Sequence, residues 1–340
     1  MTIRETAPAS APAAPTEQDW ARAIEVITRA ERPLLVCHVN PDGDALGSML
    51  GCGLALRKLG HSVQATFPGP QQLPEMFTST LPGLDLLVPP DGARTDPDVV
   101  ITFDAASPER VGELADRMAT ARDVVVLDHH ASNPGFGTVN LVEPSAAATA
   151  VLVDQLLQRL GVPLDTAISE CLYVALATDT GSFKYQATTP EVHHFAARLL
   201  AAGANHYEIS RKLFDNRPYG ALRIFGEALQ RMRLEADAAG GAGWVWTYAT
   251  LGDLARYQQP AHVLEGLIDV VRSAEEADVA CVAKQSGPGE WAVSLRSRGA
   301  VDVAAVATAL GGGGHRYAAG FTGFGDLETV IGSIRSQLAW

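Results

Sequence analysis

The feature that most constrains the fold of this chain is a β-branched apolar run, residues 124–127, that ends directly in Asp128, His129 and His130. Such a run is typical of a buried strand in a parallel sheet. Polar side chains at the carboxyl end of a parallel strand lie where open α/β sheets bind their ligands. The sequence therefore predicts an α/β fold with a functional site at one edge of its sheet.

Three other apolar runs end in the same way, and we interpret them as strands too. Residues 34–37 precede His38, Asp42 and Asp44, residues 99–103 precede Asp104, and residues 172–177 precede Asp179. Asp42 and Asp44 are two residues apart, so an extended segment would point both to one side. Taken singly, each acidic residue is also explained as a turn or helix-capping residue, and the histidines as a surface loop or core residues. The four ends together predict one shared site.

The order of the predicted elements indicates two domains. Strands alternate with helices from residue 20 to about 203, including helices at 20–29, with Asp19 as a possible N-cap, and at 45–59, which predicts a doubly wound parallel sheet. Further strands at 244–248, 279–283 and 291–295 and a helix at 302–310 predict a second, smaller α/β domain. We expect a disordered tail at 1–18, a first domain at 19–204, a helical connector at 205–237 and the second domain at 238–340.

Composition narrows the classes of protein to which the chain can belong. The net charge of −13 argues against a broad basic surface for long duplex DNA, although bound dications could still attract a short anionic substrate. Four widely spaced cysteines without a C-x-x-C pair fit a reducing compartment. The first residues lack the apolar core of a signal peptide, and no apolar stretch is long enough to span a bilayer. We therefore expect a cytoplasmic protein without a membrane partner.

Convergence of these side chains would create a strongly charged site. Like charges ~4 Å apart repel each other by ~1 kcal/mol in water and ~4 kcal/mol at an effective dielectric constant of 20. Carboxylates so close together stay ionised only around cations. Aspartate and histidine without thiolate favour Mn²⁺, with Mg²⁺, Co²⁺ and Zn²⁺ as substitutes. The donor set suits two ions that share one carboxylate, the usual arrangement for activating water in phosphoester hydrolysis.

A second motif lies near the C-terminus, where four glycines, residues 311–314, precede His315. Glycines expose backbone N–H groups to which a phosphate can come close, so Gly313, Gly314 and His315 predict a structured anion-binding loop. The alternative is a flexible linker, but a helix and two alanines flank the run. Arg296, at the end of the predicted strand 291–295, is a further candidate for phosphate binding, or else a solvated charge at a sheet edge.

In these motifs the chain resembles the DHH phosphoesterase superfamily. The resemblance rests on His38-x-Asn40-Pro41-Asp42-x-Asp44, Asp104, Asp128-His129-His130 and Asp179-Thr180-Gly181-Ser182. The glycine motif resembles the DHH-associated C-terminal domain of the RecJ-like branch. In size and layout the chain is similar to NrnA-like bifunctional oligoribonucleases and 3′-phosphoadenosine 5′-phosphate phosphatases, and to actinobacterial cyclic di-AMP phosphodiesterases. The resemblance covers residues 20 to about 330.

The resemblance implies a role for each motif residue. It implies that His38, Asp42 and Asp104 hold one Mn²⁺, and that Asp44, Asp104, His129 and Asp179 hold a second. His130 would bind the scissile phosphate or donate a proton, and Asp128 would orient the histidines. Gly313, Gly314, His315 and Arg296 would hold the distal end of the substrate in a cleft between the domains.

The expected activity is therefore hydrolysis of short nucleotides by metal-activated water. The candidate substrates are nanoRNA, linear di-adenylate, cyclic di-AMP and 3′-phosphoadenosine 5′-phosphate, with nucleoside monophosphate or phosphate as product. Two alternatives remain at this point: an enzyme like the family II inorganic pyrophosphatases, and a nucleotide-binding sensor without turnover. We also expect a homodimer, the commonest assembly of soluble proteins.

Overall fold

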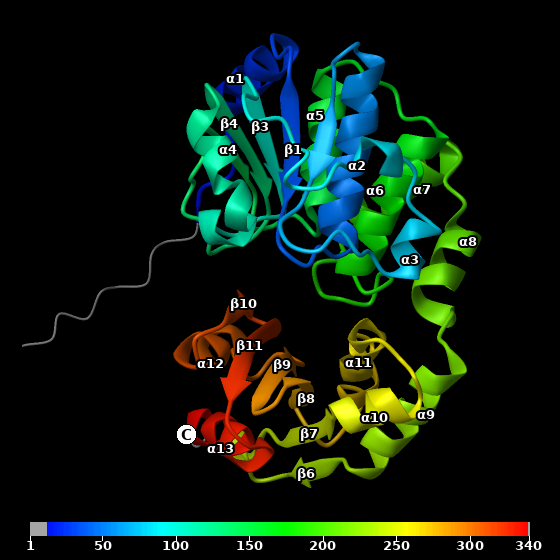
Figure 1. Ribbon diagram of the computed structural model, residues 1–340, viewed down its shortest axis with the longest axis vertical. Coiled ribbons are helices and arrows are strands. Elements are labelled where there is room, and N and C mark those ends of the chain that lie inside the picture. The colour runs from blue at the N-terminus through cyan, green and yellow to red at the C-terminus, as the bar shows by residue number, and fades with distance from the viewer. Residues whose placement is uncertain (1–11, 339–340) are drawn as a thin grey trace, which may run out of the picture. The chain divides into compact units, whose positions relative to one another are not determined.

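The structure is a computed structural model that describes residues 12–338 (Figure 1). The chain divides into two compact units, one that ends at Asp215 and one that starts at Asn216. Residues 1–11 of the predicted tail lie outside the described residues, whereas residues 17 and 18 already belong to a helix. The connector expected at 205–237 is divided between the units, because residues 205–215 belong to the first and 216–237 to the second.

The first unit is built on a five-stranded parallel sheet with the order β2-β1-β3-β4-β5. Its strands are β1 (Pro33–Cys37), β2 (Gln64–Thr66), β3 (Val99–Phe103), β4 (Asp123–Asp128) and β5 (Val139–Val142). The helices are α1 (Glu17–Thr28), α2 (Gly43–Lys58), α3 (Glu75–Thr78), α4 (Ala115–Thr120), α5 (Thr149–Arg159), α6 (Thr166–Asp179), α7 (Pro190–Ala201) and α8 (His206–Ser210). Short 3₁₀ segments lie at η1 (Leu84–Leu86) and η2 (Pro108–Leu114), and a π turn at η3 (Arg211–Asp215).

Both faces of this sheet are buried, which confirms the predicted doubly wound fold. Leu35, Ile101 and Val125 pack into a core with α1, α2, α5 and α6. Their neighbours in sequence, such as Val36 and Val100, pack on the other face against η2 and α4. The alternation follows from the two-residue period of a strand, and it explains why these strands are apolar throughout.

The predicted strand at residues 172–177 is wrong, because this segment lies inside helix α6. An apolar run of this length does not distinguish a strand from a buried helix by periodicity. The deciding signals are alanine and leucine, which favour helix, and Asp165, whose carboxylate caps the helix by accepting from the Ile168 N–H at 2.9 Å. The N-cap expected at Asp19 is also wrong, since Thr16 caps α1 and Asp19 completes a capping box with it.

Helices α2 and α6 pack very closely because glycines recur every four residues along α2. A Cβ at Gly43 would lie 2.5 Å from the Thr178 side chain, and a Cβ at Gly51 would lie 3.0 Å from Leu172. Between them, a Cβ at Gly47 would lie against the carbonyl oxygen of Cys171. This glycine face brings the first turn of α2 next to the last turn of α6.

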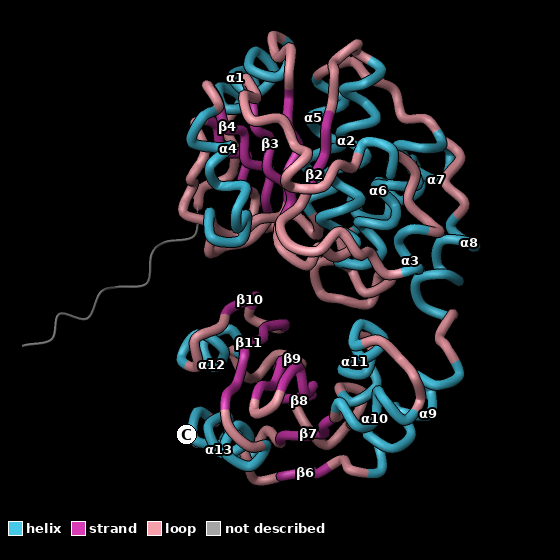
Figure 2. The backbone as a smooth tube through the Cα atoms, viewed as in Figure 1, coloured by secondary structure: helices cyan, strands magenta, loops and turns pink. Residues whose placement is uncertain are grey.

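The second unit contains a six-stranded sheet with the order β10-β11-β9-β8-β7-β6, whose strands are magenta in Figure 2. Among the described strands of this sheet, only β7 and β8 pair in parallel. Its strands are β6 (Arg233–Glu235), β7 (Trp244–Ala249), β8 (Val279–Gly287), β9 (Glu290–Ser297), β10 (Gly313–His315) and β11 (Ala318–Phe324). Its helices are α9 (Tyr219–Gln230), α10 (Leu251–Arg256), α11 (Leu267–Val271), α12 (Val303–Ala309) and α13 (Leu327–Gln337). The second α/β unit and its predicted strands and helix are thus confirmed.

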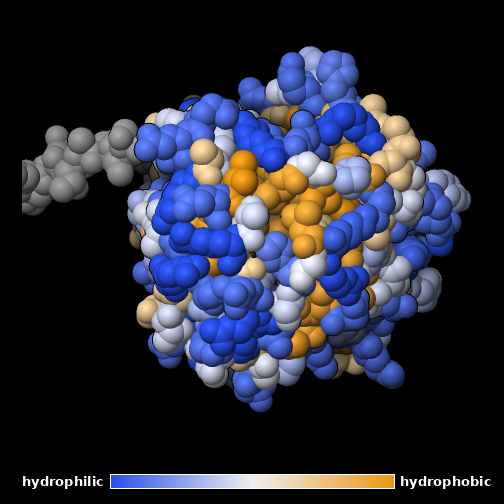
Figure 3. All heavy atoms as spheres, turned by 90° about the horizontal axis from the view of Figure 1, so that it is seen from above, coloured by the Kyte–Doolittle hydropathy of each residue, from blue (hydrophilic) through white to orange (hydrophobic). Residues whose placement is uncertain are grey.

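The face of the protein seen in Figure 3 carries a band of hydrophobic side chains with hydrophilic residues on both sides. Within residues 12–338, no helix combines the length and the hydropathy needed to cross a bilayer.

We expect Gly47→Ala to destabilise the first unit, because the added Cβ overlaps the Cys171 carbonyl. Overpacking of this kind costs roughly 1–3 kcal/mol. Gly226→Ala in α9 is the matched control, since nothing lies within 4 Å of its added Cβ, and it should raise the Tm slightly. Scanning calorimetry of both variants makes the comparison, and an unchanged Tm for Gly47→Ala would contradict the close helix packing.

The second unit should lose stability in acid through Asp253. Arg231 donates two hydrogen bonds to this buried carboxylate, of 2.6 and 2.8 Å, and they hold its pKa well below the usual range. A depressed folded-state pKa gives stability that is present above the unfolded pKa of about 3.9 and disappears as the pH falls below it. Asp253→Asn should cost roughly 2–4 kcal/mol at pH 7 and less at pH 3.

Urea unfolding followed by tryptophan fluorescence suits this test, because Trp244, Trp246 and Trp291 lie in the second unit. The control is Glu265→Gln, whose exposed ion pair with Lys284 should contribute less than about 1 kcal/mol. Equal losses in the two variants at pH 7 would show that the Asp253 pair does not stabilise the unit.

Candidate metal centre

The predicted site residues converge at the carboxyl edge of the parallel sheet in the first unit. His38 follows β1, Asp104 follows β3, Asp128 ends β4, and His129 and His130 come next. Asp42 and Asp44 lie at the start of α2 rather than in an extended segment, with Asp42 as the N-cap. Asp179 is the last residue of α6, so a helix rather than a strand delivers it.

Two groups of potential ligand atoms lie side by side in this site. In the first group, His38 Nε2 is 3.8 Å from Asp42 Oδ1 and 3.5 Å from Asp104 Oδ2. In the second, His129 Nε2 is 3.8 Å from Asp44 Oδ2, 3.4 Å from Asp179 Oδ2 and 3.5 Å from Asp104 Oδ1. Asp104 therefore turns one carboxylate oxygen toward each group.

The backbone of Asp104 is held in a rare conformation, with φ of 55°, in the left-handed region. Non-glycine residues seldom adopt it, and such outliers concentrate at functional sites. The Asp104 N–H donates to the Leu127 carbonyl at 3.0 Å, which ties the turn to the neighbouring strand. This turn directs the Asp104 side chain, 4% exposed, between the two groups.

Asp44 is held by the N-terminus of helix α5, which the sequence reasoning missed. The Thr149 and Ala150 N–H groups donate to its carboxylate at 2.6 and 3.2 Å, and the Ser48 hydroxyl donates at 2.9 Å. The Thr149 hydroxyl also donates to Asp104, at 3.1 Å. Helix N-termini favour negative charge, so α5 stabilises this part of the site. The only signal in the sequence is a run of small residues before Thr149.

Buried partners orient both histidines that follow β4. Asp128 is completely buried, and its two oxygens lie 2.6 Å from His130 Nδ1 and 2.6 Å from Asn133 Nδ2. His129 Nδ1 instead lies 3.0 Å from the Ala146 carbonyl. With the proton on Nδ1, His129 presents Nε2 to the second group as a neutral ligand would.

The charge of the site shifts the pKa values of its members. Burial disfavours the charged form of both imidazoles, but neighbouring carboxylates outweigh this effect. Contacts with Asp104 and Asp42 raise the pKa of His38 to about 10. The pKa of His129 is likewise raised to about 10, by Asp179, Asp104 and Asp44. Burial also raises the pKa of Asp44, and that of Asp179 to about 7. The histidines in turn lower the pKa of Asp104 and of Asp42 against the effect of burial. The shifts therefore favour protonated histidines beside ionised Asp104 and Asp42.

The geometry of each group fits a small dication. Two atoms bound to one ion at ~2.1 Å lie at most ~4.2 Å apart. His38 Nε2 lies 3.5 and 3.8 Å from its carboxylate neighbours in the first group, and His129 Nε2 lies 3.4 and 3.8 Å from Asp179 and Asp44 in the second. Carboxylate and imidazole donors without sulfur suit Mn²⁺, Zn²⁺ or Co²⁺, and carboxylates also suit Mg²⁺.

Comparison with known proteins accounts for this site. A model of the DHH family, N-terminal domain, matches residues 33–176, and a model of the DHHA1 domain matches residues 248–338. The bifunctional oligoribonuclease and PAP phosphatase NrnA of Thermus thermophilus is 33% identical over 96% of this chain and 97% of its own. The chain belongs to the DHH family. It is therefore a phosphoesterase and a hydrolase, as predicted, and the DHHA1 match confirms the expected relationship of the second unit.

One further relative and one solved structure resemble the chain over most of its length. The cyclic-di-AMP phosphodiesterase GdpP of Geobacillus thermodenitrificans is 28% identical over 86% of this chain and 44% of its own. An exopolyphosphatase-related protein of Bacteroides fragilis has a solved structure with a TM-score of 0.86, 24% identity and coverage of 95% and 96% of the two chains. This likeness shows that the fold extends over both units.

The glycine motif of the DHH-family chain is an edge strand rather than a loop. Gly313 and His315 belong to β10, which pairs with β11, opposite Gly320 and Ala318. A Cβ at Gly314 would lie 2.6 Å from the Ala318 carbonyl, so close strand packing requires this glycine, whereas Gly313 has open space. The expected loop is wrong for residues 313–315, because they form one arm of a hairpin.

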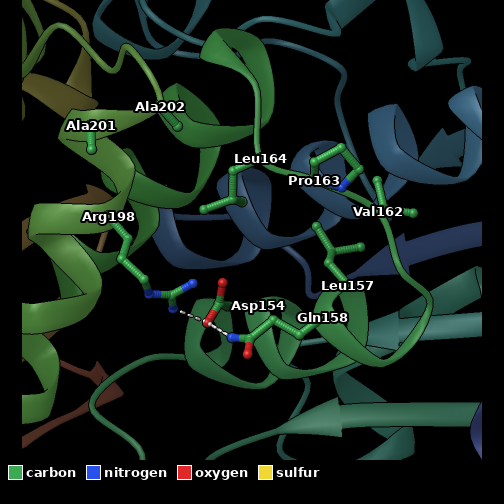
Figure 4. A pocket seen from close by; sticks show the side chains of 9 residues that line it. All are labelled: Asp154, Leu157, Gln158, Val162, Pro163, Leu164, Arg198, Ala201 and Ala202. Carbon is green, nitrogen blue, oxygen red and sulfur yellow. Dashed lines mark hydrogen bonds and ion pairs between the residues drawn. The ribbon is translucent and has the colours of Figure 1, made fainter.

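A separate hollow of about 420 Å³ in the first unit contains none of these site residues (Figure 4). Asp154 and Gln158 of α5 and Arg198 of α7 line it together with apolar side chains. Arg198 and Gln158 both donate to one Asp154 oxygen, so this carboxylate connects α5 to α7.

We expect Asp104→Asn to abolish binding of both ions, because Asp104 faces both groups. Asparagine tolerates the left-handed backbone of this position, so the fold should survive. The matched control is Asp42→Asn, an exposed member of the first group alone, which should still bind one ion. Mn²⁺ stoichiometry by calorimetry and the Mn²⁺-induced rise in Tm measure the difference. Two ions bound by Asp104→Asn would contradict a shared carboxylate.

Proposed function

We propose that this DHH-family chain is a Mn²⁺-dependent phosphoesterase that hydrolyses short nucleotides. The observation that carries the proposal is the Asp104 carboxylate, one oxygen of which faces His38 and the other His129, at 3.5 Å each. A carboxylate between two ligand groups is the arrangement that two-ion phosphoester hydrolysis requires. Mg²⁺, Co²⁺ and Zn²⁺ are the substitutes to test.

Each group of ligands has a distinct role in this proposal. His38, Asp42 and Asp104 hold one ion, and Asp44, Asp104, His129 and Asp179 hold the other. The ions supply an activated water and neutralise charge that develops on the phosphate. His130 is the proton donor or phosphate ligand, because contact with Asp128 raises its pKa against the effect of burial and favours the imidazolium. Asp128 orients this ring and is a positioning residue.

The second unit is proposed to bind the part of the substrate that is not cleaved. Ala318 of β11 pairs with Arg296 on one side and His315 on the other, so these two side chains lie on one face of the sheet. Two strand spacings separate them, about 10 Å. Gly313 and Gly320 leave this part of the face without side chains. We propose that His315 and Arg296, together with the backbone of Gly313 and Gly314, form a polar surface that binds a phosphate and a flat base.

The proposed substrates follow from the size of this surface and from the names of the relatives. An oligoribonuclease and PAP phosphatase and a cyclic-di-AMP phosphodiesterase both align along most of the chain. We propose linear di-adenylate, short RNA, cyclic di-AMP and 3′-phosphoadenosine 5′-phosphate as the panel. The cytoplasmic location and the homodimer stay predictions.

The test is product analysis on this panel with purified chain and Mn²⁺. We expect release of AMP from the diesters, or of inorganic phosphate from the monoester, and complete loss of activity with excess chelator. Inorganic pyrophosphate tests the pyrophosphatase alternative in the same assay. Turnover of pyrophosphate alone would overturn the proposal.

His315→Ala should weaken substrate binding without removing either ion, because His315 is not a proposed ligand. We expect kcat/KM on linear di-adenylate to fall ~10-fold or more, mainly through KM if the contact is equally strong in the ground and transition states. A small generic phosphodiester, bis(p-nitrophenyl) phosphate, should be cleaved nearly as before. Equal losses on both substrates, or loss of bound Mn²⁺, would assign His315 to the catalytic centre instead.

A further inference from the structure

Arg110 places a positive charge at the edge of the candidate metal centre. It lies in η2, six residues after Asp104, and its side-chain nitrogen Nη2 is 3.0 Å from His38 Nδ1. The residue is exposed, and within residues 12–338 no carboxylate lies within ion-pair distance of it. Arg57 and Arg122 of the same unit, by contrast, pair with Asp85 and Asp123.

The backbone fixes the position of Arg110 relative to the centre. Its carbonyl accepts a hydrogen bond from the Val39 N–H at 2.9 Å, which ties η2 to the loop between His38 and Asp42. Two residues later the chain turns at Gly112, whose φ is 53°. A Cβ at this position would lie 2.9 Å from the Pro68 side chain, so the turn packs closely against Pro68. The base of the Arg110 side chain is therefore held by the segment that carries the first group of ligands.

If His38 binds an ion through Nε2, its Nδ1 atom cannot both donate a hydrogen bond to the Val39 carbonyl and accept one from Arg110. Its Nε2 faces Asp42 and Asp104, and its Nδ1 lies 2.8 Å from the Val39 carbonyl. A ligating Nε2 carries no proton, so the ring proton is on Nδ1 and is donated to Val39. In this tautomer Nδ1 has no lone pair for Arg110, and no other acceptor among residues 12–338 lies within hydrogen-bond distance of its guanidinium group.

We propose that Arg110 binds a non-bridging oxygen of the phosphate that is cleaved. This inference rests on the proposed function and assigns it a residue that the motifs do not include. Four aspartates balance the charge of two dications, so the charge of the substrate phosphate needs a further cation. Guanidinium is planar and donates two hydrogen bonds to phosphate oxygens. Its position beside His38 places Arg110 next to the first group of ligands, where it would stabilise charge that develops during cleavage.

The test compares Arg110→Ala with Arg57→Ala. Both variants remove one arginine from the first unit, but Arg57 lies near the C-terminus of α2, whereas the candidate metal centre lies at the N-terminus of that helix. Arg57 lies 13 residues after Asp44, about 20 Å along the helix. We expect Arg110→Ala to lower kcat/KM at least ~100-fold on linear di-adenylate and also on bis(p-nitrophenyl) phosphate, because the contact is with the reacting phosphate. Arg57→Ala should stay within threefold of the wild type on both substrates.

Two further measurements separate substrate contact from a structural role. Arg110→Ala should keep two bound Mn²⁺ and the Tm of the wild type, and millimolar guanidinium should restore part of its activity. Arg110→Lys should recover less than the full activity, since a lysine ammonium lacks the planar fork. If the wild type with Mn²⁺ cleaves nothing in the panel, the proposed function fails. If the wild type is active and Arg110→Ala is within threefold of it, or has lost Mn²⁺, this inference fails.

Discussion

The mutual repulsion of four aspartates is the constraint on which the rest of the first unit depends. Their carboxylates surround His38 and His129. The distances from the Nε2 atoms of these histidines to the nearest carboxylate oxygens of Asp42, Asp44, Asp104 and Asp179 lie between 3.4 and 3.8 Å. Each close pair of like charges costs up to ~4 kcal/mol in a partly buried site. The raised pKa values of both histidines and of Asp179 show the same imbalance, because protons are retained where positive charge is needed.

The fold maintains this crowding through features far from the ligands in sequence. The N-terminus of α5 stabilises Asp44 through the Thr149 and Ala150 N–H groups. The glycine face of α2 lets α6 approach until Asp179 faces Asp44 and His129, and the left-handed backbone of Asp104 directs one oxygen to each group. These features hold the carboxylates close together although their negative charges repel one another. Bound cations would offset this repulsion.

Two polar residues beside the candidate metal centre, Asp128 and Arg110, have different environments that suit them to different roles. Asp128 is completely buried and has partners at both oxygens, which suits it to orient His130 rather than to bind an ion. Arg110 has the opposite character, since it is exposed and lies beside His38, and it has no carboxylate partner among the residues that the structure describes. The centre thus combines a buried positioning residue on one side with an available cation on the other, which suits an anionic substrate that arrives from solvent.

The sequence by itself determined the parallel sheet and which side chains meet in the candidate metal centre, because apolar runs of strand length and Asp or His at their ends are local properties. Only the tertiary structure decided which type of element carries Asp179, since the apolar run before this residue is compatible with either a strand or a buried helix. It also revealed Thr149, Ser48 and Arg110, which join the site through contacts between segments distant in sequence. The four glycines show the same limit, because only the pairing of β10 with β11 distinguishes Gly314, required by strand packing, from Gly313, which faces open space.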